Sequence, residues 1–467
     1  MSKVEVNTVE PQCGTTLTLG GSGDTVALGS GASQTGFGRT GTVDWQTGSI
    51  KTTTFTAANG EGYFANTSAG AFTMNLPAGS AGDIVSVVDY TNTFSAYNLT
   101  VTPNGTEKIG GTNASATLNT EGQSVTFVYV DGVEGWKNIQ DSTSNVIGET
   151  FVTATVSGAC NTLTTAPDCA NIKIATFVNP GTFCVSSIST TPADNTVGYM
   201  VVAGGGAGGA GVGGGGGAGG YREGRNVPID NFTASPLVAN TPSNAVTISS
   251  SPYPITVGGG GAGASCSTSG NNGDPSTFDT ITSAGGGGGA SYAGPSNQGV
   301  PGGSGGGGGY IFPGAPGPFP VPDSFKGTGN TPPTSPPQGS DGGKGFINYT
   351  PSGATTSAGG GGAGADGVTP GGNAAGNGGC GVASSITGAS VTRAGGGGGG
   401  TTGVNAPAST GGVGGPGGGG PGGALPAGAG VAGLAQLGGG GGGGSDAPGV
   451  TGSNGGSGIV IIRYKFQ

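Results

Sequence analysis

The chain has 467 residues, including 114 glycines and 30 prolines, and its formal net charge is −10. Charged residues make up 8% of the sequence, against about a quarter in an ordinary globular protein. An acidic chain without clustered lysine and arginine is poorly suited to phosphate contacts, so we expect no nucleic-acid partner. No apolar run approaches the ~18 residues of a membrane-spanning helix, so we expect no membrane insertion.

The composition also argues against an enzyme. Histidine is absent, which removes the commonest general base, the Ser-His-Asp arrangement and histidine metal ligands. Glu121, Asp131 and Glu134 are close in sequence, and a carboxylate pair can hydrolyse glycosides. Nothing in the sequence indicates a cleft around them, so an acidic surface is the preferred interpretation. We predict no catalytic residues, no cofactor and no metal site.

The six cysteines do not form a zinc-binding pattern, because none is spaced as C-x-x-C. Cys160, Cys169 and Cys184 are close enough in sequence to include one disulfide bond. Free, partly buried thiols are the alternative.

Residues 1–50 mix short apolar stretches with Gly, Ser and Thr, without helical periodicity. They predict an extended arm for attachment or oligomerisation. The first residues lack the apolar core of a signal peptide, so we expect synthesis in a cytoplasm.

Residues 51–147 predict a small antiparallel β-sandwich or barrel. Strands are expected at 71–76, 83–88, 98–101 and 124–130, separated by glycine-, asparagine- and proline-rich turns. Val125, Phe127 and Tyr129 alternate with smaller residues and should share one face.

Residues 148–203 predict a β connector, with strands at 151–156, 171–177 and 182–187. The remainder, 204–467, is glycine-rich and closes with an apolar strand at 458–466. This closing strand is expected to pair with Tyr199–Ala203 and so join the two ends of the domain.

The glycine blocks, such as 213–217, 285–289, 395–400 and 438–444, predict a polyglycine II bundle. Collagen needs glycine at every third residue, and these irregular blocks break that rule. A flexible linker does not account for repeated blocks separated by aromatic and proline-rich segments. Polyproline-II-type helices have no internal hydrogen bonds, so their backbones must pair with neighbours. Side chains would hold the backbones apart, and Gly287→Val should therefore unfold the domain or greatly lower its melting temperature. Almost no α-helix is expected anywhere.

The segment 310–358 carries aromatic residues among prolines and is the candidate receptor-contact loop. Such residues give contact area at a low cost in conformational entropy. Capping of the bundle ends is the alternative role. The candidates are Tyr310, Phe312, Phe319, Phe325, Phe346 and Tyr349.

Several motifs resemble tail-fibre-like virion proteins of marine cyanophages and their relatives. The N-terminal ones are VNTVEPQCGTTLTL at 6–19 and GFGRTGTVDW at 36–45. GDIV at 82–85 and VYVDG at 128–132 are similar to the β domain that follows. VVAGGG at 201–206 and GIVIIRY at 458–464 are similar to the glycine-rich halves.

The resemblance implies a virion structural protein, released by lysis, that forms a homotrimer through its N-terminal part. The glycine-rich half also resembles the tip adhesins of T-even phage long tail fibres, although this chain carries β domains upstream. We therefore expect a fibre protein that attaches the particle to a host surface protein or polysaccharide. Its N-terminal region would contact other virion proteins. A capsid-associated or decorative fibre without a specific receptor is the alternative.

Overall fold

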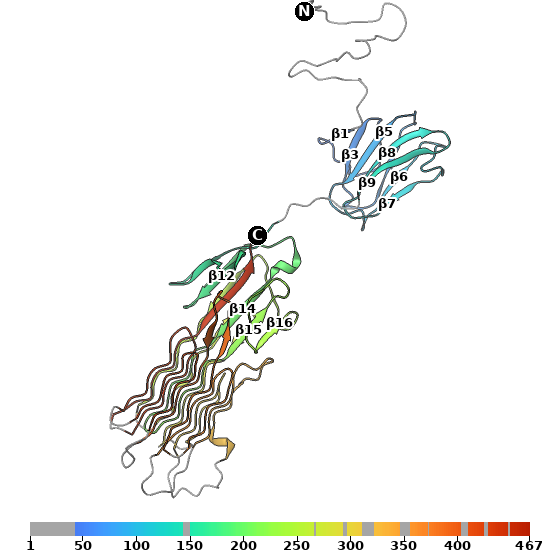
Figure 1. Cartoon of the computed structure of the whole chain (residues 1–467). Helices are drawn as coiled ribbons and strands as arrows, with labels where there is room; N and C mark the ends of the chain where they lie inside the picture. The colour runs from blue at the N-terminus through green and yellow to red at the C-terminus, as the bar shows by residue number, and fades with distance from the viewer. Residues whose placement is uncertain are drawn as a thin grey trace, which may run out of the picture. The chain divides into compact units, whose positions relative to one another are not determined.

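The computed structural model describes residues 43–142, 150–265, 268–292, 297–310, 322–345, 355–371, 373–402, 410–424, 428–446 and 449–467. The chain divides into two compact units, 1–148 and 149–467 (Figure 1). Regular structure in the described residues is β, apart from two short 3-10 helices, η1 (Pro192–Asn195) and η2 (Asp323–Phe325). No helix in these ranges has the length and apolar character needed to cross a membrane.

The first unit is a sandwich of two sheets, and it begins within the predicted arm. One sheet has the order β1 (Asp44–Trp45), β3 (Glu61–Ala65), β5 (Ile84–Asp89), β8 (Ser124–Asp131) and β9 (Gly135–Ser142). The other has the order β2 (Phe55–Thr56), β4 (Phe72–Asn75), β6 (Leu99–Thr102) and β7 (Ala116–Leu118). Val125 and Phe127 are buried between the sheets with Trp136, and Tyr129 packs against them, as the alternation predicts.

The first unit is all β as predicted, but its strands are not all antiparallel, contrary to the expectation. β1, β3 and β5 are parallel neighbours, as are β2, β4 and β6. From β2 to β6 the chain enters the two sheets alternately, so neighbours within one sheet are separated by a strand in the other. Each strand therefore runs in the same direction as the previous strand of its sheet. The later pairs, β5–β8, β6–β7 and β8–β9, are antiparallel.

The second unit contains a second sandwich. One sheet has the order β10 (Thr153–Val156), β13 (Gly181–Ser187), β18 (Pro252–Thr256), β19 (Ser276–Phe278) and β20 (Ile281–Ser283). The other has the order β11 (Thr162–Ala166), β12 (Cys169–Phe177), β23 (Ile459–Lys465), β14 (Thr196–Val202), β15 (Tyr221–Arg225) and β16 (Val238–Asn240), and β17 (Val246–Thr247) pairs with β14. A small hairpin of β21 (Val382–Ser384) and β22 (Val391–Arg393) forms a separate two-stranded sheet.

The closing strand β23 ties the ends of the glycine-rich region together. It pairs with β14 in the predicted antiparallel sense, with Tyr199 opposite Ile462 and Val202 opposite Ile459. It also pairs with β12 on its other side. The expected connector 148–203 is therefore not a separate body, because its strands share sheets and a core with β18–β20 and β23.

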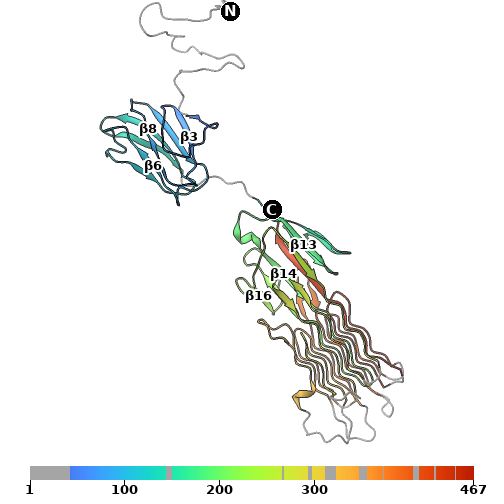
Figure 2. The same cartoon turned by 180° about the vertical axis from the view of Figure 1, so that it is seen from behind.

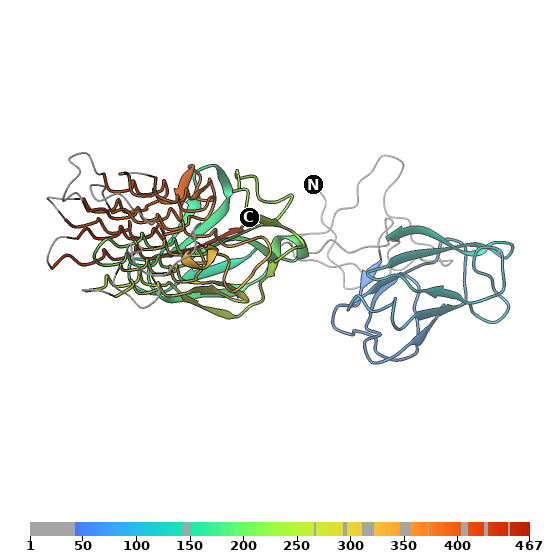
Figure 3. The same cartoon turned by 90° about the horizontal axis from the view of Figure 1, so that it is seen from below.

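The glycine blocks form extended rods in the predicted polyglycine II packing (Figures 2 and 3). Successive amides of the rod 203–210 donate in turn to three neighbouring rods, and every third amide donates to the same rod. The amides of Gly206 and Gly209 donate to the carbonyls of Gly217 and Gly214 on one rod. Those of Gly205 and Gly208 donate to Gly456 and Ser453 on the second, and those of Gly204 and Ala207 donate to Asp274 and Asn271 on the third. Three further rods donate to its carbonyls, from Gly261, Gly286 and Gly441. A return to the same neighbour at every third residue is the pattern of a helix with three residues per turn. Backbone groups that such a helix leaves unpaired are satisfied between rods.

Contact between rods explains why whole blocks are glycine. A Cβ built on Gly287 would lie 1.9 Å from the carbonyl oxygen of Val300. At Gly397 it would lie 2.1 Å from the carbonyl oxygen of Gly441. Side chains at these positions would break the hydrogen bonds between backbones, because the rods would have to move apart.

Candidate functional site

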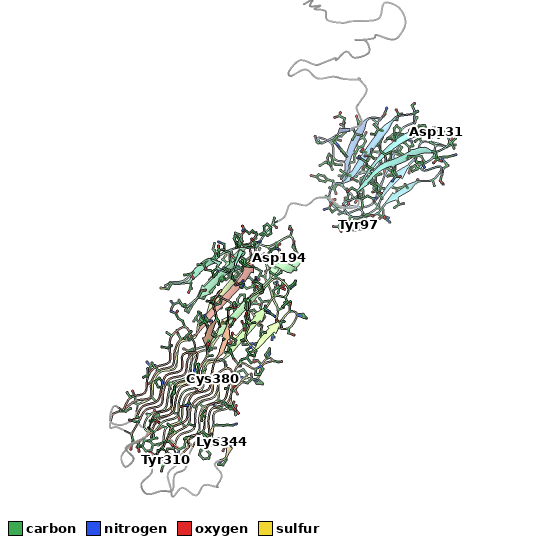
Figure 4. All side chains as sticks on the ribbon, in the orientation of Figure 1. Tyr97, Asp131, Asp194, Tyr310, Lys344 and Cys380 are labelled. Atoms are coloured by element: carbon green, nitrogen blue, oxygen red, sulfur yellow. The ribbon has the colours of Figure 1, made fainter. Side chains whose placement is uncertain are left out.

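The rods carry the chain between two ends of the bundle. At the end that we call the base, Ala203 follows β14 and donates to Gly220, which precedes β15. At the opposite end, the far end, Gly209 donates to Gly214 across a turn at 211–212. Figure 4 shows Tyr310 and Lys344 at the far end and Asp194, in η1, on the side of the strands. The described residues that flank 311–321 and 346–354 thus lie at the end opposite the sandwich.

The candidate contact residues are only partly within the described chain. Tyr310 ends a rod and is 5% exposed, and burial raises its pKa. It therefore does not offer the exposed ring expected of a contact residue, whereas its position at a rod end matches the alternative role of capping. Phe325 is half-buried in η2. The other four candidates, Phe312, Phe319, Phe346 and Tyr349, lie outside the described residues.

A second aromatic residue packs at the far end. A Cβ built on Gly211 would lie 2.2 Å from Cδ1 of Tyr292, so the ring covers the turn between the first two rods. Gly211 has a φ of +64°, in the left-handed region that favours glycine. Tyr292 was not among the predicted candidates, because it stands alone between a glycine block and a polar segment.

Ion pairs fix the described residues around η2. Lys326 Nζ lies 2.8 Å from an Asp341 carboxylate oxygen, and Lys344 pairs with Asp323. Asp341 also accepts from the Gly329 amide at 2.8 Å. The hydrogen bond to Asp341 raises the pKa of Lys326, and the hydrogen bond from Lys344 lowers the pKa of Asp323. These contacts join the rod that follows 311–321 to the rod that precedes 346–354.

Two of the three acidic residues singled out in the sequence, Asp131 and Glu134, have structural partners. Asp131 accepts from the amides of Val133 and Glu134, both at 2.8 Å, and these bonds lower its pKa. Glu134 pairs with Lys137 at 2.7 Å. Both residues thus shape the hairpin between β8 and β9, in keeping with the interpretation of an acidic surface.

A buried ionic cluster in the base was not predicted. Arg463 on β23 is fully buried and donates to both carboxylate oxygens of Asp168, at 3.1 and 3.0 Å. Its Nε lies 3.5 Å from Asp230, and Phe232 presents its ring to the guanidinium at 5.4 Å. Burial raises the pKa of Asp230 to about 6. The sequence did show one sign of this cluster, because Arg463 stands inside the apolar stretch 459–466. Its partners could not be identified, since Asp168 and Asp230 lie more than 200 residues earlier in the chain.

A second buried carboxylate lies nearby in the fold. Glu223 on β15 is 2% exposed and accepts from the Tyr221 hydroxyl at 3.0 Å and the Ser235 amide at 2.9 Å. Ser384 on β21 also donates to it. Burial raises the pKa of Tyr221 and lowers that of Arg393. The hydrogen bond from Ser384 to Glu223 joins the sheet to the β21–β22 hairpin.

The cysteines within the described ranges are free thiols. Cys160, Cys184 and Cys380 are exposed, and Cys169 is half-buried. No disulfide joins Cys160, Cys169 and Cys184, so the alternative of free thiols holds for these three, although only Cys169 is partly buried. Within the same ranges, no group of three or more Cys, Asp or Glu side chains is placed to hold a metal ion.

Comparison with known proteins gives one family. The model of the glycine-rich domain family matches residues 179–465, which include β14, β23 and the rods between them. No curated protein matches the chain. The matched segment covers more than half of the sequence, and the chain belongs to the glycine-rich domain family.

Proposed function

We propose that this chain is a bacteriophage fibre protein that attaches the virion to the host surface through the far end of its glycine rods. The observation that carries the proposal is the separation of the two ends of the bundle. The base is held by paired strands and a buried core. The described residues on either side of the connections 311–321 and 346–354 lie at the far end (Figure 4). Rods that pair only through their backbones allow these connections to differ in sequence without disturbing the packing.

The N-terminal motifs support a virion setting. Residues 6–19 and 36–45 resemble tail-fibre-like proteins of marine cyanophages. In this proposal the N-terminal part contacts other virion proteins and forms a homotrimer, and the partner at the far end is a host surface protein or polysaccharide. A decorative fibre without a receptor is the competing role.

Binding to host cells tests the proposal. The full chain, fluorescently tagged, should bind intact host cells saturably and compete with adsorption of the phage. A variant with Phe312, Phe319, Phe346 and Tyr349 changed to serine should lose both activities. Val133→Ser, at a residue of the first unit that is 68% exposed, is the matched control and should retain them. Absence of binding by an intact oligomer, with the mass checked by light scattering, would favour the decorative role.

A further inference from the structure

The first unit carries a groove on the outer face of its five-stranded sheet. The groove has a volume of about 760 Å³ and is lined from β1, β3, β5, β8 and β9. This volume is within the range of about 300–1,000 Å³ that is usual for small-molecule sites. Ser124 and Thr126, which alternate with the core residues Val125 and Phe127 along β8, line the groove, whereas Phe127 does not. The groove therefore belongs to the surface side of the sheet.

Aromatic residues form one wall of the groove. Trp45 is 42% exposed, and its ring centroid lies 5.3 Å from that of Phe64. A Cβ on Gly62 would lie 2.6 Å from Cε3 of the indole, so glycine there allows the ring to rest on the backbone of β3. The opposite wall includes Ile139, which is 59% exposed. Large apolar side chains left open around a hollow are typical of binding sites.

Hydroxyl and amide groups line the floor and the second wall. Thr126 faces Gln140 across the β8–β9 pair, and Ser124 faces Ser142. Thr126 Oγ1 lies 2.8 Å from Ser86 Oγ, which orients the hydroxyl. These groups donate and accept hydrogen bonds without a charge.

The charge of the lining restricts the ligand. None of the described residues that line the groove is basic. Asp141 contributes a carboxylate, which accepts a hydrogen bond from Gln123 Nε2 at 3.3 Å. An anionic ligand would meet this carboxylate without a compensating cation. An entirely apolar ligand would bury the Gln140 amide against apolar atoms, at a cost of about 1–3 kcal/mol for a buried polar group that gains no hydrogen bond.

We infer that the groove binds a neutral carbohydrate. A sugar ring has an apolar C–H face, which can stack on Trp45 and Phe64, and peripheral hydroxyls, which can pair with Thr126, Gln140 and Asp141. The site lies in the first unit, so it is separate from the far-end contacts proposed above and does not depend on them.

An array of neutral, amino and acidic oligosaccharides tests the inference with the full chain. We expect retention on neutral glycans, followed in solution through tryptophan emission, because Trp45 is one of only two tryptophans and the other, Trp136, is buried in the core. Trp45→Ala should weaken binding by about tenfold or more, as for an aromatic residue at the centre of a binding site. Ile139→Arg should also weaken it without touching the core.

Tyr97→Ala is the matched control, since Tyr97 is 46% exposed and does not line the groove. Thermal unfolding followed through Trp136 checks that each variant is folded. Retention on acidic glycans alone, absence of retention on every neutral glycan, or unchanged affinity of Trp45→Ala would overturn the inference. A change of oligomeric mass in Ile139→Arg would instead assign the groove to a contact between copies of the chain.

Discussion

At the scale of single residues, Arg463 has the largest expected effect on stability. It is fully buried on the central strand β23 and faces Asp168 and Asp230. Removing one partner of a buried ion pair leaves an uncompensated charge, which typically costs about 3–5 kcal/mol. Arg463→Met should therefore lower the free energy of unfolding of the second unit by about 3 kcal/mol, measured by denaturant unfolding.

The control for Arg463→Met is Lys344→Met, which removes the ion pair with Asp323, in which both side chains are exposed to solvent. Such pairs contribute about 0–1 kcal/mol, so this variant should unfold close to the wild type. Equal losses in the two variants would contradict the role assigned to the buried cluster.

The loss caused by Arg463→Met should also depend on pH. The pKa of Asp230 is about 6 in the fold, above its usual 3.8, so the folded state holds this proton more tightly than the unfolded chain. Ionised Asp230 thus costs stability as the pH rises from about 4 to 6. The positive charge of Arg463 lowers the pKa of Asp230. In Arg463→Met this pKa should therefore be higher, and the loss of stability on ionisation of Asp230 should continue to higher pH. The difference between variant and wild type should therefore be smaller at pH 5 than at pH 8, and a larger difference at pH 5 would contradict this account.

Residue patterns predicted the core better than the polar contacts. Alternation on β8 correctly placed Val125 and Phe127 inside. The ionic cluster was not predictable in the same way, because Asp168, Asp230 and Arg463 come from three distant parts of the chain. Tyr310 shows the same limit for the candidate site: its aromatic type indicated contact area, but its burial depends on how the rods end.

At the scale of elements, the rods depend on the absence of side chains where backbones touch. Gly287→Ala places a methyl group against the carbonyl of Val300, and overpacking of this kind costs about 1–3 kcal/mol or more. We expect a lower melting temperature of the second unit, followed by circular dichroism. Gly371→Ala is the matched control, because a Cβ there meets no atom within 4 Å. Equal melting of the two variants would argue against direct backbone contact between rods.

The strands predicted from the sequence are present, but other strands, such as β3 and β9, and many of the pairings were not predicted. The expected strands at 71–76, 83–88 and 124–130 correspond to β4, β5 and β8. Their parallel neighbours were missed, because the turn residues do not reveal that the chain crosses from one sheet to the other. In the rods the limit is stronger, since glycine has no side chain to mark a register. The sequence predicts that rods pair, but not that Gly206 donates to Gly217.

At the scale of the whole molecule, the two units should unfold separately, and β23 should be essential to one of them. β23 lies between β12 and β14, and its residues belong to both cores of the second unit. Removal of residues 459–467 exposes both neighbouring strands and separates the last rod from the sheet. The bundle gains its stability from many rods together, because each glycine loses more entropy on folding than other residues do. We therefore expect the truncated second unit not to fold.

The tryptophans allow each unit to be followed in one sample. Trp45 and Trp136 are both in the first unit, so their fluorescence reports its unfolding, whereas circular dichroism reports both units. The truncated chain should keep the fluorescence transition of the wild type and lose the second transition in circular dichroism. Loss of the fluorescence transition as well would mean that the first unit depends on the second. Retention of both transitions would mean that the rods hold together without the strand that joins their ends.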